Sequence, residues 1–338
     1  MIKQNIDCPS NGHLEDTYKR RINYLRISIT DRCNLRCVYC TPQGRIQKLP
    51  HSAILRYEEI LRIAKIGAER GIDKIRVTGG EPLVRKGCGA FLEKLAGIPG
   101  IKDISLTTNG ILLEKHLDHL HDIGIKRLNI SLDTLDPEKY RRITGCDAFD
   151  RVWAAISAAL KRGFSPIKIN VVALGGINND ELQNLAALSL KYPLHVRFIE
   201  QMPGFGAGLQ EARTPLTEMD IKSIIAPLGD MVICETNTYF GPASRYRIAG
   251  APGEIGFISP VSHHFCSRCN RLRLTSDGFL RSCLLSDSVT DIKTPLRNKA
   301  SDAELAGIIA AAVEKKPLEK TGMTQSAACG SKMFSIGG

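Results

Sequence analysis

The chain has 338 residues, of which 43% are hydrophobic and 24% charged, so it can bury one large core or two moderate ones and is not intrinsically disordered. It has no apolar run long enough to cross a membrane and no apolar stretch behind a basic start, so we expect a cytoplasmic protein that neither spans a membrane nor is secreted. Lysine and arginine exceed aspartate and glutamate by 11, which favours an anionic partner such as nucleic acid, an acidic lipid surface or a phosphorylated small molecule.

Short β-rich runs alternate with amphipathic helical stretches from residue 24 to about residue 200, at the spacing of repeated βα units. Such a repeat predicts parallel strands in either a barrel or a doubly wound sheet. The six expected strands are residues 24–30, 74–78, 103–107, 127–133, 167–173 and 195–200.

Alternate residues within these strands differ in polarity, and this pattern separates the two folds. Strands of a doubly wound sheet are covered by helices on both faces and should be almost entirely apolar. In the first strand the aliphatic Leu25, Ile27 and Ile29 instead alternate with polar residues, and the other strands repeat the pattern. The polar positions are Arg26, Ser28, Thr30, Lys74, Arg76, Thr78, Ser105, Thr107, Asn129, Ser131, Asp133, Lys168, Asn170 and Arg197.

A parallel strand with helices outside has one place for a polar face, which is the inside of a barrel. Because six strands are fewer than the eight of a closed barrel, the sequence predicts an α/β fold with a partial (β/α)6 barrel of the TIM type and a cationic interior. A sheet with one solvated face is the alternative, although that arrangement is usual for antiparallel sheets.

The sequence pattern changes after Pro203, so we divide the chain into a barrel unit, residues 1–203, and a C-terminal α+β extension, residues 204–338. The last expected helix begins with a capping box formed by Ser301 and Glu304. The first 20 residues and the tail that ends in Gly337-Gly338 are candidates for flexible chain ends. The other elements expected in the extension are a helix near 217–228 and strands near 231–235, 243–248 and 254–258.

Eleven cysteines in a chain without an export signal favour reduced thiols, some of which bind metal. Cys33, Cys37 and Cys40 lie in DRCNLRCVYC, directly after the first expected strand. Three thiolates at this spacing can converge on one centre, and a 4Fe–4S cluster held by three ligands keeps one iron open to a substrate or cofactor. Zinc is the weaker interpretation, because structural zinc normally takes four protein ligands.

The sequence Thr78-Gly79-Gly80-Glu81-Pro82 ends the second expected strand, where adjacent glycines let backbone groups approach a ligand closely. Active residues of such barrels lie at the C-terminal ends of strands. The cysteine triplet after the first strand together with GGEP after the second resembles the radical S-adenosylmethionine superfamily. The resemblance implies that the open iron binds S-adenosylmethionine, whose cleavage yields a 5′-deoxyadenosyl radical that abstracts hydrogen from the substrate. The residues implied to contact this cofactor are Tyr39, Gly80, Ser131 and Met202.

A second triplet, Cys266, Cys269 and Cys283, has the spacing C-x2-C-x13-C. His263 or His264 could complete a zinc site here, so the spacing leaves zinc and an iron–sulfur cluster open. Arg271 and Arg273 lie on one side of an extended segment inside this triplet, and their forked donors suit phosphate. The remaining cysteines belong to no motif and are interpreted as buried or surface thiols: Cys8, Cys88, Cys146, Cys234 and Cys329.

Motifs along nearly the whole chain resemble the GTP 3′,8-cyclase family, the lyases that begin molybdenum cofactor biosynthesis. They are YLRISITDRCNLRCVYC, IRVTGGEPLVR, LTTNG, ISLDTLDP, VRFIEQMP, GEIGFISP, CSRCNRLRLT and the closing Gly-Gly. The resemblance implies two 4Fe–4S clusters, the second on Cys266, Cys269 and Cys283 with its open iron on the guanine of GTP. It also implies hydrogen abstraction from ribose C3′ followed by a bond between C3′ and C8, which gives (8S)-3′,8-cyclo-7,8-dihydro-GTP.

The same resemblance implies which residues act and which partners the protein has. The catalytic residues would be the first cysteine triplet with Arg271 and Arg273, and Gly337-Gly338 would reach toward the active centre. An electron donor such as flavodoxin or ferredoxin, a receiving cyclic pyranopterin monophosphate synthase and a homodimer are the implied partners, with no nucleic acid or membrane. The GTP contacts would be Arg26, Lys74, Arg76, Thr107, Lys168, Arg271, Leu272 and Arg273.

Two other functions compete with this interpretation. One is a different radical S-adenosylmethionine enzyme that carries an auxiliary cluster. The other, from a different class, is a basic zinc-containing protein that binds nucleic acid, but such a protein should interleave basic residues with exposed aromatics. Aromatic residues make up only 6% of the chain, and its best-placed cations alternate toward the barrel interior.

Overall fold

The computed structural model describes residues 12–40, 48–202, 215–234, 242–263, 266–286 and 288–319. The six expected strands all form, each with bounds within two residues of the expected ones. They are β1 (Tyr24–Ser28), β2 (Lys74–Thr78), β3 (Asp103–Thr108), β4 (Arg127–Ser131), β5 (Ile167–Ala173) and β6 (Leu194–Glu200). They pair in parallel in chain order, so the predicted partial barrel is confirmed.

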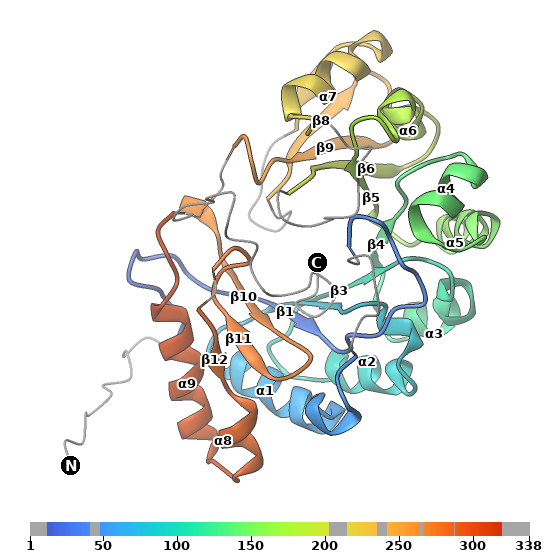
Figure 1. Cartoon of the computed structure of the whole chain (residues 1–338). Helices are drawn as coiled ribbons and strands as arrows, with labels where there is room; N and C mark the ends of the chain where they lie inside the picture. The colour runs from blue at the N-terminus through green and yellow to red at the C-terminus, as the bar shows by residue number, and fades with distance from the viewer. Residues whose placement is uncertain are drawn as a thin grey trace.

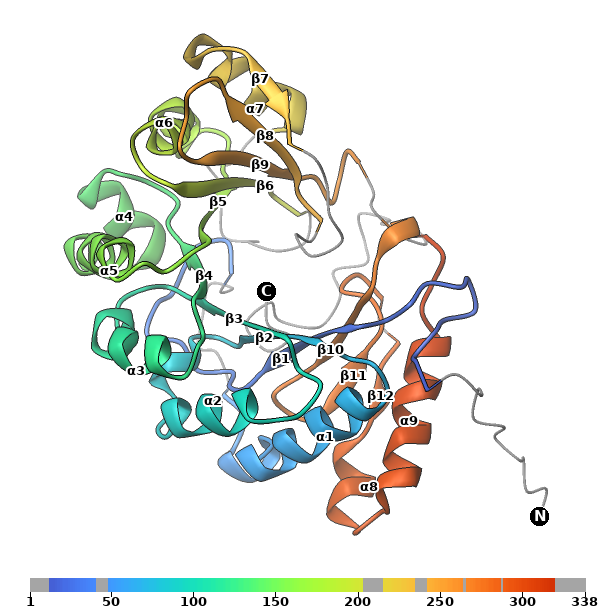
Figure 2. The same ribbon diagram turned by 180° about the vertical axis from the view of Figure 1, so that it is seen from behind.

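Helices cover the outer face of this curved sheet (Figures 1 and 2). They are α1 (Tyr57–Glu69), α2 (Cys88–Ala96), α3 (Leu117–Asp122), α4 (Pro137–Thr144), α5 (Phe149–Lys161) and α6 (Leu182–Lys191). In α1, for example, Ile60, Ile63 and Ile66 recur at helical spacing and are buried. They belong to the same hydrophobic cluster as Leu25 and Ile27 of β1.

The extension does not form a sheet of its own. Its strands are β7 (Met231–Ile233), β8 (Ser244–Ile248), β9 (Glu254–Ile258), β10 (Arg271–Leu274), β11 (Phe279–Arg281) and β12 (Thr290–Asp291). They lengthen the barrel sheet at both edges, in the order β12-β11-β10-β1-β2-β3-β4-β5-β6-β9-β8-β7. Both β10 and β9 join in parallel, to β1 and β6 respectively. The run of parallel strands from β10 to β9 is therefore longer than the sequence predicted.

The helices of the extension lie at the two ends of the sheet (Figure 1). They are α7 (Glu218–Ile225), α8 (Lys293–Arg297) and α9 (Asp302–Glu314). The predicted capping box of α9 is confirmed, because Ser301 Oγ accepts from Glu304 N and Ser301 N donates to Glu304 Oε2. Short 3-10 turns complete the structure: η1 (His51–Ala53), η2 (Pro82–Val84), η3 (Leu113–His116), η4 (Asn179–Glu181), η5 (Ala226–Leu228) and η6 (Cys266–Arg268).

Part of the N-terminal segment that was expected to be flexible packs against the rest of the protein. Residues 12–20 pack against the body, since Leu14 and Asp16 are buried and the backbone of Glu15 forms an antiparallel β-bridge with that of Arg21. This part of the expected flexible end is therefore ordered. None of the described helices has the length and apolar composition of a membrane span.

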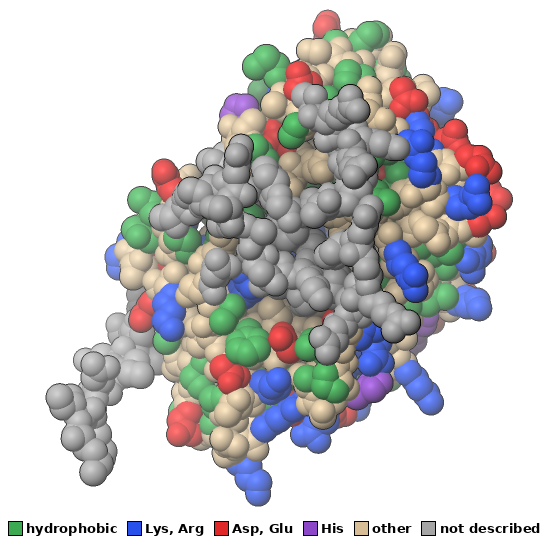
Figure 3. Space-filling view, in the orientation of Figure 1, with side chains coloured by type: hydrophobic (Ala, Val, Ile, Leu, Met, Phe, Trp, Pro, Cys, Tyr) green, Lys and Arg blue, Asp and Glu red, His purple; other side chains and the backbone are tan. Residues whose placement is uncertain are grey.

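Charged side chains of both signs mix around the periphery of the face seen in Figure 3. Pro203, His264, Cys8, Cys329 and Gly337-Gly338 lie outside the described residues.

Candidate active site

One cavity of about 830 Å³ opens on the inner face of the partial barrel. Both predicted cysteine triplets line it, although they are more than 200 residues apart in sequence: Cys33, Cys37, Cys40, Cys266, Cys269 and Cys283. Arginines from four strands line it too: Arg26, Arg76, Arg197, Arg271 and Arg273. The cavity is also lined by the sequence-predicted Tyr39, Gly80, Ser131, Met202 and Thr107.

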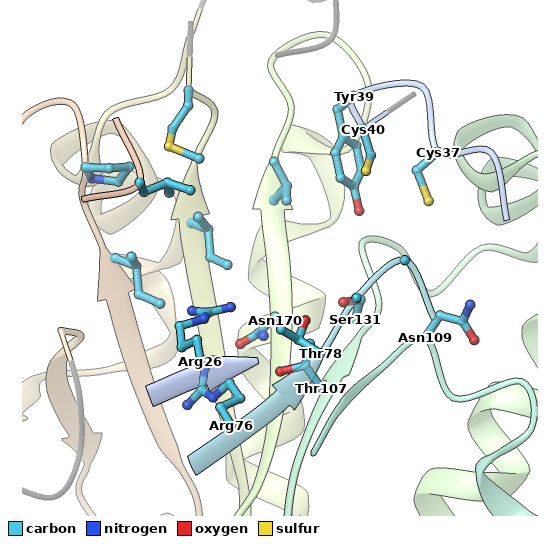
Figure 4. A pocket seen from close by; sticks show the side chains of 18 of the residues that line it. Arg26, Cys37, Tyr39, Cys40, Arg76, Thr78, Thr107, Asn109, Ser131 and Asn170 are labelled. Atoms are coloured by element: carbon cyan, nitrogen blue, oxygen red, sulfur yellow. The ribbon is translucent and has the colours of Figure 1, made fainter. Parts of the chain in front are cut away.

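The cavity has a cationic end and an end that carries the first cysteine triplet. Figure 4 shows Arg26 and Arg76 together at one end, and Cys37, Tyr39 and Cys40 at the other. The small polar side chains of Thr78, Thr107, Ser131 and Asn170 lie between them and come from four neighbouring strands or their ends. An elongated ligand that carries negative charge at one end would match this arrangement.

The loop of the first triplet is held by close backbone contact with the GGEP segment. Gly80 N donates to Thr30 O over 2.8 Å, and a Cβ on Gly80 would lie 2.4 Å from Arg32 O. A Cβ on Gly79 would lie 2.7 Å from Thr30 O, and the positive φ of Gly79 also disfavours a side chain. The two glycines therefore let the cysteine loop lie directly against the β2 loop, a role that the sequence analysis did not foresee.

Glu81 ties the ends of β2 and β3 together behind the cysteine loop. Its fully buried carboxylate accepts from Thr108 Oγ1, Asn109 N and Leu83 N over 2.8, 2.6 and 3.0 Å. Burial raises the pKa of Glu81 to about 7 against the effect of these hydrogen bonds. Asn109 then donates to Asn34 Oδ1 in the cysteine loop over 2.8 Å. Glu81 thus fixes Asn109, a cavity residue that sequence reasoning missed.

Tyr39 is held by a buried carboxylate at the end of β4. Its hydroxyl donates to Asp133 Oδ2 over 2.7 Å, and Asp133 Oδ1 accepts from Val172 N over 2.8 Å. Burial raises the pKa of Asp133 to about 6. Asn178 Nδ2 donates to the Asp133 carbonyl and fixes the backbone at this point. The Tyr39 ring is thereby set against the cavity beside Cys37 and Cys40.

The arginines of the cavity are buried close to one another. In the register of the sheet, Arg26 lies between Arg273 and Arg76. Burial and the charges of Arg273 and Arg76 hold the pKa of Arg26 well below its usual range, and burial with nearby cations lowers that of Arg197 to about 9. Neither Arg273 Nη1 nor Thr107 Oγ1 hydrogen-bonds to another described residue. Such crowded, buried guanidinium groups favour a polyanionic ligand, whose charge would offset their repulsion.

The second triplet lies beside β10, where cations surround it. Burial alone would raise the pKa of Cys269, but the charges of Arg271 and Lys316 lower it to about 7. This environment favours the thiolate form that a metal requires. His263 is exposed and interacts with Ser262 and Glu218 rather than with the cysteines.

The donor set fits iron–sulfur clusters better than single metal ions. Within the described segments, no three His, Cys, Asp or Glu side chains are grouped closely enough to hold one ion. Each triplet instead presents three thiols to an open cavity, and a 4Fe–4S cluster takes its thiolates at separate irons. Three thiols would leave its fourth iron facing the cavity.

Three predicted GTP contacts do not line the cavity. Lys74 pairs with Asp103 over 3.2 Å, and burial together with Arg197 lowers the pKa of Lys168 to about 4. Both lysines stand at the N-terminal ends of their strands, whereas the cavity extends toward the C-terminal ends. Leu272 alternates with Arg271 and Arg273, so it faces the hydrophobic core on the other side of β10. Polarity alternation identified the inner face correctly, and contact of these three residues with GTP stays a prediction.

Comparison with known proteins agrees with this site. The family model of the radical SAM superfamily matches residues 27–188, and that of Molybdenum Cofactor Synthesis C matches residues 194–321. The chain is 51% identical over 308 residues to the GTP 3′,8-cyclase of Moorella thermoacetica, covering 90% of this chain and 94% of that protein. With the GTP 3′,8-cyclase of Thermodesulfovibrio yellowstonii it shares 47% identity over 326 residues, 96% of this chain and 100% of that one.

The chain belongs to the GTP 3′,8-cyclase family. The sequence-based assignment is thus confirmed. Among solved structures, this member of the GTP 3′,8-cyclase family resembles SuiB of Streptococcus suis with a TM-score of 0.60, covering 87% of this chain and 69% of that one. Because the two are only 16% identical, the likeness concerns the fold alone.

Arg197 and Asn109 are cavity residues that the sequence analysis did not assign to the site. For Arg197 a signal was present, since it lies on the polar face of its strand. Asn109, Glu81 and Asp133 act through contacts between loops, which no local pattern reveals.

Proposed function

We propose that this chain converts GTP to (8S)-3′,8-cyclo-7,8-dihydro-GTP, the first step of molybdenum cofactor biosynthesis. The observation that carries the proposal is the shared cavity, where two cysteine triplets and a group of arginines face one space. The name shared by the curated relatives supports GTP as the substrate.

Cys33, Cys37 and Cys40 would hold one 4Fe–4S cluster, with S-adenosylmethionine beside Tyr39, Gly80, Ser131 and Met202. Cys266, Cys269 and Cys283 would hold a second one, facing the guanine. When bound, the first cluster and S-adenosylmethionine supply the one-electron chemistry that removes hydrogen from a ribose carbon.

The chain's own residues bind and orient the nucleotide. Arg26, Arg76, Arg197 and Arg273 would hold the triphosphate with forked donors at the cationic end of the cavity. Thr107 lies between the cationic end and the first cysteine triplet, and its hydroxyl is available to hydrogen-bond the ribose. A fixed ribose position matters because hydrogen transfer requires contact between the reacting carbons, and the enclosed site keeps other hydrogen donors away.

In the net reaction the C3′–H bond breaks, a C3′–C8 bond forms and N7 gains a proton. S-adenosylmethionine becomes methionine and 5′-deoxyadenosine, so the balance needs two electrons and one proton. We infer that a flavodoxin or ferredoxin supplies the electrons in the cytoplasm, and that the product passes to cyclic pyranopterin monophosphate synthase. We also propose that the protein assembles as a homodimer.

Anaerobic reconstitution with iron and sulfide tests the proposed cofactors. Two clusters correspond to about eight irons per chain, and replacing Cys266, Cys269 and Cys283 by alanine should leave about four. Zinc without iron would contradict the proposal. The Cys33→Ala variant should form no 5′-deoxyadenosine with S-adenosylmethionine and dithionite, whereas Cys234→Ala, a cysteine outside the cavity lining, should behave as the wild type.

A further inference from the structure

Lys316, just after α9, contacts the segments that carry two cysteines of the second triplet. Its side chain is buried, with 3% exposure. Its Nζ donates to Arg271 O over 2.8 Å and to Ser282 O over 2.6 Å, and it also hydrogen-bonds the Cys269 thiol. Arg271 follows Cys269 by two residues and Ser282 directly precedes Cys283. One ammonium group therefore joins both segments and uses all three of its N–H donors.

Arg20, from the N-terminal segment, completes this attachment. Its Nη1 donates to Cys266 O over 2.6 Å and its Nη2 donates to Pro317 O over 2.7 Å. Its Nε pairs with the buried Asp16 over 2.6 Å, which fixes the guanidinium. Residues 316 and 317 are thus linked to all three cysteine segments, although they lie 33 or more positions from any of these cysteines in the sequence.

The charge of Lys316 matches the chemistry of an iron–sulfur site. Burial lowers the pKa of Lys316, and Arg20 lowers it further, while the Cys269 and Cys283 thiolates favour the ammonium form. Its described hydrogen-bond acceptors are otherwise two uncharged carbonyls. A buried cation needs an anion close by, and cluster thiolates supply one. Hydrogen bonds to the sulfurs and nearby charge are also known to set cluster potentials.

We propose that Lys316 is a positioning residue of the second cluster: it orients Cys269 and Cys283, retains the bound cluster and raises its reduction potential. This inference rests on the proposed second cluster. Lys316 does not itself line the cavity, so it acts through the segments of the second triplet that it holds.

The test uses the full chain with Cys33, Cys37 and Cys40 replaced by alanine, so that iron reports on the second triplet only. The Lys316→Met variant is compared with Lys315→Met, which removes the same charge from the adjacent, exposed position. We expect Lys316→Met to lose iron to a chelator about 10- to 100-fold faster. Its cluster should also show a more negative midpoint potential in an electron paramagnetic resonance titration. Lys315→Met should match its parent in both measurements.

Thermal unfolding of the metal-free chains checks that the variants fold. Should Lys316→Met not fold, Lys316→Gln keeps an amide donor for the carbonyls without the charge and should still shift the potential. If the parent chain holds no iron, the proposed second cluster itself is wrong. If it holds about four irons and both potential and iron loss are unchanged in the folded Lys316 variant, the role of Lys316 is refuted while the second cluster stands.

Discussion

A guanidinium group that is buried beside other guanidinium groups keeps its charge at a cost, unless an anion comes close. Burial and the neighbouring Arg271 lower the pKa of Arg273 to about 10, and Arg273 Nη1 has no hydrogen bond to the described residues. A bound triphosphate would supply both the anion and the missing acceptor. Binding of the nucleotide would then offset the cost of burying these guanidinium groups together.

The Arg273→Gln variant is expected to bind GTP about 10- to 100-fold more weakly, because a charged hydrogen bond is lost. Cleavage of S-adenosylmethionine without GTP should persist, since the first triplet is untouched. Equilibrium binding and 5′-deoxyadenosine formation measure the two effects. Arg268→Gln, an exposed arginine between Cys266 and Cys269, is the matched control and should bind GTP normally.

The pKa of Glu81, which burial raises from 4.5 to about 7, predicts a pH dependence of stability. The folded chain holds this proton more tightly than the unfolded chain, so the free energy of unfolding should fall as pH rises from 4.5 to 7. The contribution is at most about 3 kcal/mol. Urea unfolding of the metal-free wild type and of Glu81→Gln at pH 5 and pH 8 measures this contribution as the change with pH in the difference between their free energies of unfolding. The control is Glu58→Gln, at an exposed position. Its free energy of unfolding should differ from that of the wild type by the same amount at pH 5 and pH 8.

At the scale of elements, the loops after β1, β2 and β3 behave as one unit. The cysteine loop lies against Gly79 and Gly80, and Glu81 links the β2 loop to Asn109. Asn109 in turn holds Asn34, between the first two cysteines of the triplet. The geometry of the first triplet therefore depends on backbone that belongs to three strands.

Gly80→Ala should disrupt the first triplet while the barrel still folds. A Cβ at this position would lie 2.4 Å from Arg32 O and 2.6 Å from Arg32 C, so the backbone of the cysteine loop must move. Reconstituted iron should drop from about eight to about four per chain. At Gly97 the nearest atom would be 3.6 Å from the new Cβ, so Gly97→Ala serves as the control and should keep the full content. Equal iron in both variants would contradict the close-contact explanation.

At the scale of the whole molecule, the extension supplies both ends of the parallel run. The chain leaves β9 at one end and reaches β10 at the other through residues 259–270, and Cys266 and Cys269 lie on this connection. The extension thus brings the second triplet to the cavity that the first triplet also lines. Neither unit of the chain alone contains the complete site.

The sequence predicts features that depend on neighbouring residues better than contacts between segments that are far apart in the chain. The six barrel strands, the inner polar face and the α9 cap follow from alternation and capping, which are local patterns. The pairing of β10 with β1 and β9 with β6 joins distant segments, and no short pattern specifies it. For the same reason the anchoring roles of Lys316, Arg20 and Asp133 were not foreseen. The cysteines and GGEP were found because their chemistry dictates their spacing.

In the proposed reaction the cavity presents ribose C3′ of GTP to the cofactor site. The most direct test incubates the anaerobically reconstituted chain with S-adenosylmethionine, dithionite and GTP deuterated at C3′. We expect 5′-deoxyadenosine to increase with GTP but not with ATP, and to carry the deuterium. Formation of 5′-deoxyadenosine that is independent of GTP, or that contains no deuterium, would contradict the proposed reaction.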